Sequence, residues 1–162
     1  AECVYDVTFY FAHHYLEKGD RTIDQMVQAA RSGKQNIAEG AAAGNTSKET
    51  EIKLTNVAKA SLQELLVDYE DFLRVRGLKQ WQPDDARLAQ TKRACAAHND
   101  SEYYRKAMPE RSAETIANIA ITLIHQTDWL LNKLIEKLEI QFVENGGVKE
   151  QMTKARKEYR GY

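Results

Sequence analysis

The sequence predicts an all-α fold: an antiparallel up-down four-helix bundle with a short extra helix in the third connection and a C-terminal tail. Three observations support this class. Glycine (8) and proline (2) are scarce among the 162 residues, so the chain has few turns. Apolar residues recur at steps of three and four over long segments. Short polar turns separate these segments, which favours antiparallel helices in one domain spanning residues 1–162.

The first expected helix covers residues 3–18. Val4, Val7 and Phe11 lie near helical spacing, and Gly19 follows the segment. The alternation in "VYDVTFYF" also permits a strand, but no partner strand is predicted elsewhere. The chain opens without Met or a recognisable signal peptide, which is compatible with a start inside the first helix of a longer native protein.

The second helix is expected to open with a capping box at Thr22, in which a hydroxyl and an amide satisfy free backbone donors. The segment 41–47 closes it, and Gly44 or Asn45 offers a left-handed cap. The third helix is expected to open with a capping box at Thr46. The pair forms a helical hairpin.

The third helix is predicted to stop at Gly77, which completes a core of residues 1–80. A turn leads to an insert helix over 84–98, and 99–112 is predicted to be a loop. The fourth long helix is expected over 112–146. The remaining residues form a basic tail, 148–162, for which the sequence leaves helical and frayed conformations open.

Composition excludes several classes of protein. The formal charge is −1, from 23 basic and 24 acidic residues, so no bulk basic field for nucleic acid exists. Two cysteines, Cys3 and Cys95, are too few for a disulfide scaffold and favour a reducing, cytoplasmic location. No apolar run reaches the roughly 18 to 20 residues that span a bilayer, so no membrane partner is expected.

The segment "ARSGKQNIAEG" (30–40) superficially resembles a phosphate-binding loop. That motif requires Ser or Thr at 35 and Gly at 28, where this chain has Gln35 and Gln28, and it follows a strand. The phosphate loop is therefore rejected. The small residues instead predict a thin helix face, with Gly33 lying across from about Val57 and Ala29 or Ala30 from about Ser61.

No recognisable metal or catalytic constellation stands out. None of the four histidines follows a Glu by three residues, and the pair Cys95 and His98 lacks a second ligand pair. The sequence thus predicts no metal, no cofactor and no enzyme. The alternative is an enzyme with a site between helices or subunits, which a pocket gathering His125 with carboxylates would favour.

Two clusters of basic residues are the candidate nucleic-acid contacts. One lies in "RVRGLK" (74–79), where a helix C-terminus attracts cations in any case. The tail carries the other cluster against only two acidic residues, although a solvated terminal helix is the simpler explanation of it. The candidates are Arg74, Arg76, Lys79, Lys149, Lys154, Arg156, Lys157 and Arg160.

A polar row lies beside the apolar stripe of the second helix. It contains Ser32, Asn36 and Glu39, and the third helix places Ser61 and Glu64 at a comparable boundary. Such a row meets an RNA or partner subunit in some proteins. More often it satisfies polar groups where helices meet, which is the interpretation favoured here.

These segments carry a resemblance. "NIAEG" (36–40), "SKETE" (47–51) and "AKASLQELLVDYEDFLRVRGL" (58–78) resemble bacterial four-helix-bundle proteins encoded by intervening sequences of ribosomal RNA genes. The segments at 117–139 and 142–156 resemble the C-terminal extension of the suffix subgroup of this family. The family motif maps to Gly33, Asn36, Glu39, Gly40, Ser61 and Glu64.

The resemblance implies a cytoplasmic homo-oligomer, a ring of five copies, with no established catalytic residue. Relatives include the accessory variability determinant of diversity-generating retroelements, a basic pentamer that binds a reverse transcriptase and its RNA. This chain departs from that relative because its net charge is −1. The function expected is a non-enzymatic scaffold or accessory protein that contacts RNA, DNA or a nucleic-acid enzyme.

Overall fold

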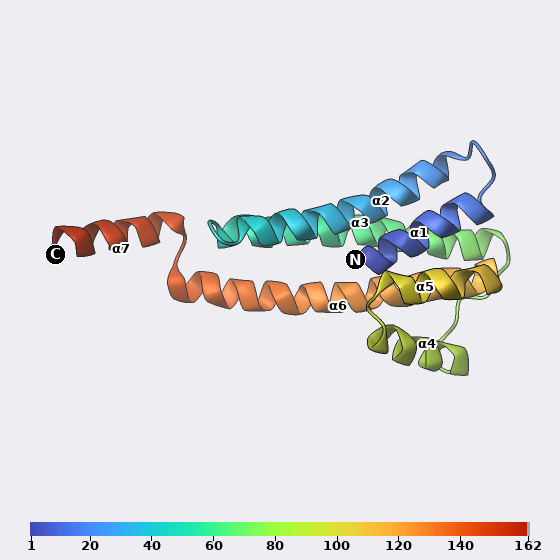
Figure 1. The fold of residues 1–162 in the computed structure, drawn as a ribbon. Helices are drawn as coiled ribbons and strands as arrows, with labels where there is room; N and C mark the ends of the chain where they lie inside the picture. The colour runs from blue at the N-terminus through green and yellow to red at the C-terminus, as the bar shows by residue number, and fades with distance from the viewer. Residues whose placement is uncertain (162) are drawn as a thin grey trace.

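The computed structural model describes residues 1–161 and is all-α over that range (Figure 1). It contains no strand within those residues. Seven α-helices and one 3₁₀ turn follow one another along the chain. They are α1 (Glu2–Tyr15), α2 (Arg21–Ala43), α3 (Lys48–Val75), α4 (Ala86–Ala97), α5 (Ser101–Ala107), η1 (Met108–Glu110), α6 (Ala113–Asn145) and α7 (Val148–Arg160).

The core lies among α1, α2, α3 and α6. The most extensive packing joins α2 to α3 and α3 to α6, while α1 packs on both α2 and α6. Figure 1 shows α1 beside only the part of α2 and α6 that lies away from α7. Fully buried side chains include Val7, Phe11, Met26, Leu62, Leu65, Tyr69, Ile116 and Ile124.

The part of the bundle that includes α1 holds an aromatic centre. The Phe11 ring lies 4.9 Å from that of Tyr69 and 4.7 Å from that of Phe72, centroid to centroid. The Tyr69 hydroxyl donates to Thr8 Oγ1 at 2.9 Å, and both side chains are fully buried. The polar atoms of this centre therefore satisfy each other.

The α2–α3 hairpin begins and turns differently from the sequence prediction. Asp20, not Thr22, caps α2, because its carboxylate accepts the Thr22 backbone N–H at 2.8 Å. The cap of α3 is Ser47 rather than Thr46. Gly44 has φ −62, a right-handed conformation, so the predicted left-handed cap at Gly44 or Asn45 was wrong.

The turn after α3 matches the prediction. Gly77 has φ +64, which favours glycine, and its N–H donates to the carbonyl of Arg74. The insert helix α4 begins after the Asp85 cap, and α6 begins after the Ser112 cap, both close to their predicted starts.

The segment 99–112, predicted to be a loop, is mostly helical. Asp100 caps α5 by accepting the backbone N–H of Tyr103 at 2.9 Å. Tyr104 and Met108 are buried, and Tyr104 donates its hydroxyl to the carbonyl of His98 at 2.7 Å. Packing of these side chains, rather than a repeating apolar pattern, orders this short segment.

The tail is helical from Val148 to Arg160, which resolves the alternative left open by the sequence. None of its residues is buried, and it extends beyond the end of the bundle (Figure 1). Among the described helices, none has a stretch long and apolar enough to cross a membrane.

Candidate functional site

The predicted nucleic-acid residues lie in two separate places. Arg74, Arg76 and Lys79 lie at and after the C-terminal end of α3, whereas the five others lie on α7. The end of α3 and α7 lie at opposite ends of the molecule (Figure 1). One copy of the chain therefore does not bring the two clusters onto one surface.

The cluster at the end of α3 has partners within the protein. The Arg74 guanidinium contacts the Asp71 carboxylate at 2.8 Å. The Arg76 guanidinium lies 4.1 Å from the centroid of the Phe72 ring, in cation–π geometry. These contacts reduce the charge that the cluster presents to an external anion.

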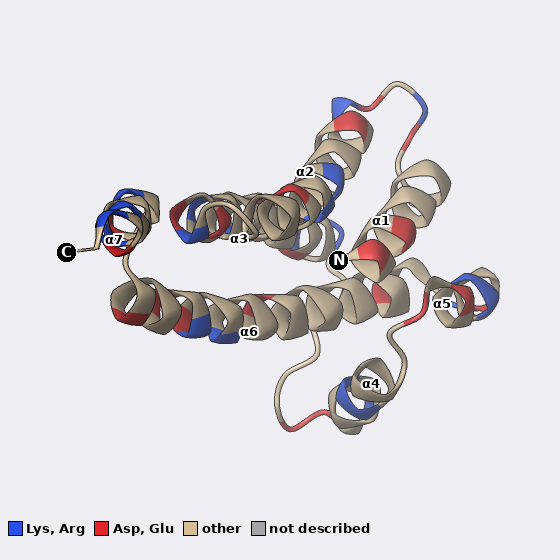
Figure 2. Cartoon of the chain, turned by 60° about the vertical axis from the view of Figure 1, so that its left-hand side comes forward, with Lys and Arg blue, Asp and Glu red and all other residues tan. Residues whose placement is uncertain are grey.

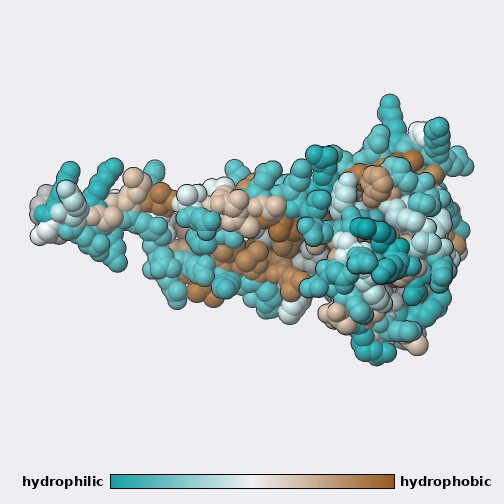
Figure 3. All heavy atoms as spheres, in the orientation of Figure 1, coloured by the Kyte–Doolittle hydropathy of each residue, from teal (hydrophilic) through white to brown (hydrophobic). Residues whose placement is uncertain are grey.

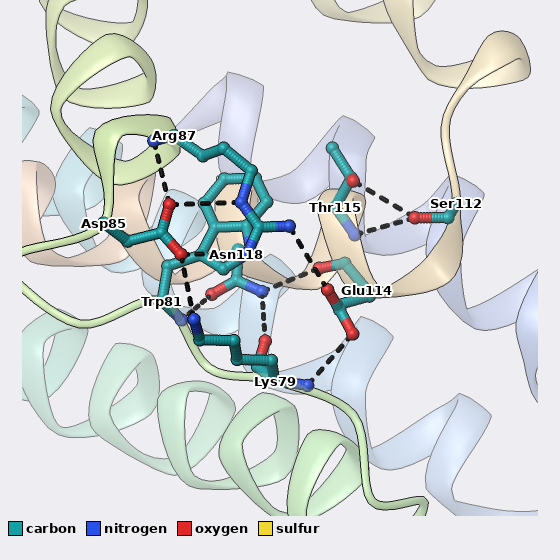
Figure 4. A network of polar contacts seen from close by, with 8 residues as sticks. All are labelled: Lys79, Trp81, Asp85, Arg87, Ser112, Glu114, Thr115 and Asn118. Carbon is teal, nitrogen blue, oxygen red and sulfur yellow. Dashed lines mark hydrogen bonds and ion pairs between the residues drawn. The ribbon is translucent and has the colours of Figure 1, made fainter.

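Lys79 belongs to a polar network that joins the 79–87 segment to α6 (Figure 4). Its ammonium lies 3.4 Å from Asp85 Oδ2, and its backbone N–H donates to Glu114 at 3.0 Å. Asp85 also pairs with Arg87 at 2.9 Å. The hydrogen bonds from Arg87 hold the pKa of the Asp85 carboxyl well below its usual range.

Asn118 is the centre of that network. Its side-chain amide donates to the carbonyls of Lys79 and Glu114 at 2.9 and 2.8 Å, and its Oδ1 accepts the backbone N–H of Trp81 at 2.8 Å. Asn118 is 2% exposed. The single buried side chain of Asn118 thus satisfies backbone groups of Lys79 and Trp81 in the connection between α3 and α4.

The α7 cluster has the opposite character. Its five basic side chains are exposed, and none forms an ion pair with a described residue. Figure 2 shows basic positions along this projecting helix. Helical spacing gathers Lys149, Arg156 and Arg160 on one face, and Met152 lies beside them, three residues from Lys149 and four from Arg156. The arrangement presents positive charge to any anion that approaches this end.

Gly33 and Gly40, which the sequence predicts to belong to a family motif, lie where α2 and α3 approach each other. A Cβ placed on Gly33 would lie 2.9 Å from Leu62 Cδ2, and one on Gly40 would lie 3.3 Å from Leu54 Cβ. Gly33 faces the side chain of Leu62 and the carbonyl of Ala58, the residue next to the approximate predicted partner Val57, whose own side chain is 42% exposed. Ala29 and Ser61 line the same groove between α2 and α3, together with Gln25, Gln28, Ser32, Glu64 and Asp68.

The polar motif residues divide into two groups. Ser32 and Ser61 share a hydrogen bond of 2.8 Å across the hairpin, and Asn36 Nδ2 donates to the Ser32 carbonyl at 2.9 Å. Glu39 and Glu64 are exposed and form no hydrogen bond or ion pair with a described residue. Ser32, Ser61 and Glu64 line a groove together with Asp68. Burial and neighbouring carboxylates raise the pKa of the Asp68 carboxyl.

The residues considered for catalysis or metal binding do not assemble. No group of three or more His, Cys, Asp or Glu in residues 1–161 could hold a metal ion. Cys95 is a buried, free thiol whose pKa is raised by burial. His125 lines a cavity between α4 and α6 in which no described lining residue is a carboxylate.

The chain matches no protein-family model, and comparisons with curated proteins and with solved structures also give no match.

Sequence reasoning missed two features of this region. The first is the Asn118 network, because an Asn in an apolar helix face carries no motif. The second is the cavity beside it. Its wall combines residues 80–99 with one face of α6, and only the spacing of Asn118, Thr122, His125 and Trp129 signals that face.

Proposed function

We propose that this protein is a non-enzymatic, homo-oligomeric helical scaffold or accessory protein that contacts the phosphate backbone of RNA or DNA through α7. The observation that supports the proposal is the basic helix α7, which projects from the bundle with none of its residues buried. Phosphate contacts from Lys and Arg provide affinity without sequence specificity. A scaffold of this kind delivers nucleic acid to, or holds it beside, a partner such as a reverse transcriptase.

The family assignment is part of the same proposal. Helices α1, α2, α3 and α6 are proposed to be the antiparallel up-down four-helix bundle of the bacterial intervening-sequence family, with α4 as the insert helix. The pairwise packing of these four helices supports that topology. The two free cysteines agree with a cytoplasmic location.

The oligomer is proposed to be a pentamer. Hydrophobic surface lies along the bundle between α1 and α7 (Figure 3). The exposed apolar side chains of α6 include Ile140 and Val143, at 58% and 81% exposure. A neighbouring copy that covered them would remove apolar area from water, the usual source of stability for subunit contacts.

Binding to a fluorescein-labelled single-stranded RNA tests the role of α7. Reversing three charges, K154E/R156E/K157E, is expected to weaken binding at least tenfold. If all five basic residues contact phosphates, log Kd should change with log salt by about 3.5, at ~0.7 per phosphate, and the triple variant should reduce that slope by about 2.

The matched control reverses the other cluster, R74E/R76E/K79E. Because Arg74 and Lys79 already have carboxylate partners, this variant is expected to weaken binding less than threefold, while its reversed charges face Asp71 and Asp85 and lower its unfolding temperature. Equal losses in the two triple variants, or a wild-type protein that binds no RNA or DNA at low salt, would contradict the α7 proposal.

Solution mass tests the oligomer. Sedimentation velocity of the wild type should give five times the chain mass, and I140E/V143E should reduce it. V75E is the control, since Val75 is 69% exposed at the opposite end of the bundle. A monomeric wild-type protein would reject the oligomer and leave the α7 contact to be judged by the RNA measurement.

A further inference from the structure

The cavity between α4 and α6 has the size of a small-molecule site. Its volume is about 800 Å³, within the range of ligand pockets in proteins. α4 buries only Cys95 and therefore fills little of the space beside α6. A hydrogen bond of 3.0 Å from Gln126 Nε2 to the Lys92 carbonyl joins the two helices, and both residues line the cavity.

The cavity is formed by one face of each helix. Leu88, Lys92, Cys95 and Asn99 repeat at helical spacing along α4 and its C-terminal end, opposite the seven lining residues of α6. The full wall consists of Gln80, Trp81, Leu88, Lys92, Cys95, Ala96, Asn99, Asn118, Ile121, Thr122, His125, Gln126, Trp129 and Leu130. Both tryptophans of the chain are in this wall.

Several side-chain hydrogen-bond donors of this wall are not available to a ligand. The amide of Asn118 and the hydroxyl of Thr122 donate to backbone carbonyls, so neither is free for a ligand. Trp81 is 6% exposed, and its indole Nε1–H is buried without a hydrogen-bond acceptor. Because this nitrogen is buried away from solvent, a ligand in the cavity meets the apolar part of the indole rather than its N–H.

The charge of the wall favours an anion. Lys92 is the charged residue of the wall, it is exposed, and it forms no ion pair with a residue in the range 1–161. No Asp or Glu lines the described cavity. An anionic group near Lys92 would therefore meet an ammonium without facing a carboxylate.

We propose that this cavity binds a small apolar monocarboxylate. The apolar body lies among Trp81, Leu88, Ile121 and Trp129, and the carboxylate lies toward Lys92. The driving force is the release of water from apolar wall, which grows with each methylene buried. The site lies on α4 and α6 and is independent of the α7 contact proposed above.

Octanoate is the probe, and 1-octanol is the uncharged probe of equal chain length. Emission from the two wall tryptophans should change saturably, and calorimetry should give a Kd of about 1 mM or tighter for octanoate. Octanol should bind about fivefold more weakly, since a solvent-exposed ion pair contributes modestly. Absence of saturable octanoate binding up to about 5 mM, where a site of that affinity would be mostly filled, would overturn the proposal.

Two pairs of variants locate the site. A96F places a ring in the cavity from an exposed position and should weaken octanoate binding at least tenfold, whereas A97F, one residue on and outside the wall, should not. K92Q should weaken octanoate about fivefold without affecting octanol, whereas R93Q should change neither. All four positions are exposed, so folding is expected to be retained.

Three outcomes of these variants would overturn the assignment. Equal effects of A96F and A97F would place octanoate elsewhere. Equal affinities for octanoate and octanol would show that the carboxylate contributes nothing to binding. A solution mass that falls in A96F but not in A97F would make the cavity a contact between copies of the chain. A loss of octanoate binding confined to A96F and K92Q supports it.

Discussion

The α2–α3 hairpin and α7 are both amphipathic helical regions, yet they stand at opposite extremes of burial. In the hairpin, two glycines bring the helices so close that an added Cβ would meet a neighbouring side chain. In α7 no residue is buried. The hairpin uses its side chains to hold the fold, whereas α7 leaves its side chains available to an external partner.

The difference between the two regions shows that the number of basic residues alone does not predict how strongly a surface binds an anion. Arg74 at the end of the hairpin and Arg156 on α7 carry the same guanidinium, but Arg74 has a carboxylate at 2.8 Å. An Arg already paired gains little from a phosphate, because it must exchange one anion for another. Because the hairpin is closely packed and α7 buries no residue, substitutions should change the free energy of unfolding strongly in the hairpin and negligibly in α7.

The largest effect is expected from Gly33→Leu. A Cβ at this position already lies 2.9 Å from Leu62 Cδ2, and the rest of a leucine side chain would force α2 and α3 apart, at a cost of about 3 kcal/mol. Chemical denaturation measures the loss. A free energy of unfolding and an oligomer mass equal to the wild type would show that the helices are not in close contact.

Gly33→Ala is the matched control for that substitution. The single methyl meets the flexible end of Leu62, which can rotate, and alanine favours the helix over glycine by about 1 kcal/mol. The stability of this variant should stay within about 1 kcal/mol of the wild type. A loss as large as that of Gly33→Leu would mean that the backbone, rather than Leu62, limits the space.

A smaller loss is expected from Tyr69→Phe. Removing the hydroxyl leaves the fully buried Thr8 Oγ1 without its donor, at a cost of about 1 to 2 kcal/mol. The double variant Thr8→Val/Tyr69→Phe removes both partners, and its loss should be less than the sum of the single losses. Additive losses in denaturation experiments would show that the two groups are not coupled.

The same tyrosine should make the fold sensitive to alkali. Burial raises the pKa of Tyr69, with the Thr8 hydrogen bond opposing this only in part. In the unfolded chain this tyrosine ionises near pH 10. Above that pH the native state holds one proton more than the unfolded state, so the free energy of unfolding falls as pH rises. The fall should be shallower in Tyr69→Phe by up to about 1.4 kcal/mol per pH unit.

Tyr159→Phe on α7 is the control for the alkaline measurement. Tyr159 is 93% exposed, so its surroundings hardly differ between the folded and unfolded chain. Its replacement should leave the slope of stability against pH unchanged. A shallower slope in Tyr159→Phe would show that α7 is buried in solution, and would remove the contrast between the two regions.

The all-α class and the approximate extents of the long helices follow from the sequence, because they depend on local periodicity, although the caps of α2 and α3 lie one or two residues from their predicted positions. Tertiary contacts decide the features that were missed. The segment containing Tyr104 and Met108 is helical because those side chains are buried, and too short to show a period. Likewise, the partner of Gly33 depends on a helix–helix register that a turn of uncertain geometry shifts by one residue.

The candidate site was predicted in the same uneven way. The basic residues of α7 are evident from composition, but their exposure is not, since a docked helix has the same sequence pattern. The internal partners of Lys79 were not foreseen because Asp85 and Glu114 approach it only in the folded chain. Charge can be counted in a sequence, whereas its availability depends on the fold.

The smallest effect on stability is expected from deleting the tail, residues 148–162. Because no side chain of α7 is buried, its removal exposes no core, and the unfolding temperature should change by less than about 2 °C. Circular dichroism measures both the transition and the loss of helical signal. RNA binding should be lost in the same variant. A clear drop in unfolding temperature at low protein concentration would mean that α7 packs on the bundle, so that its basic side chains serve the fold as those at the end of α3 do.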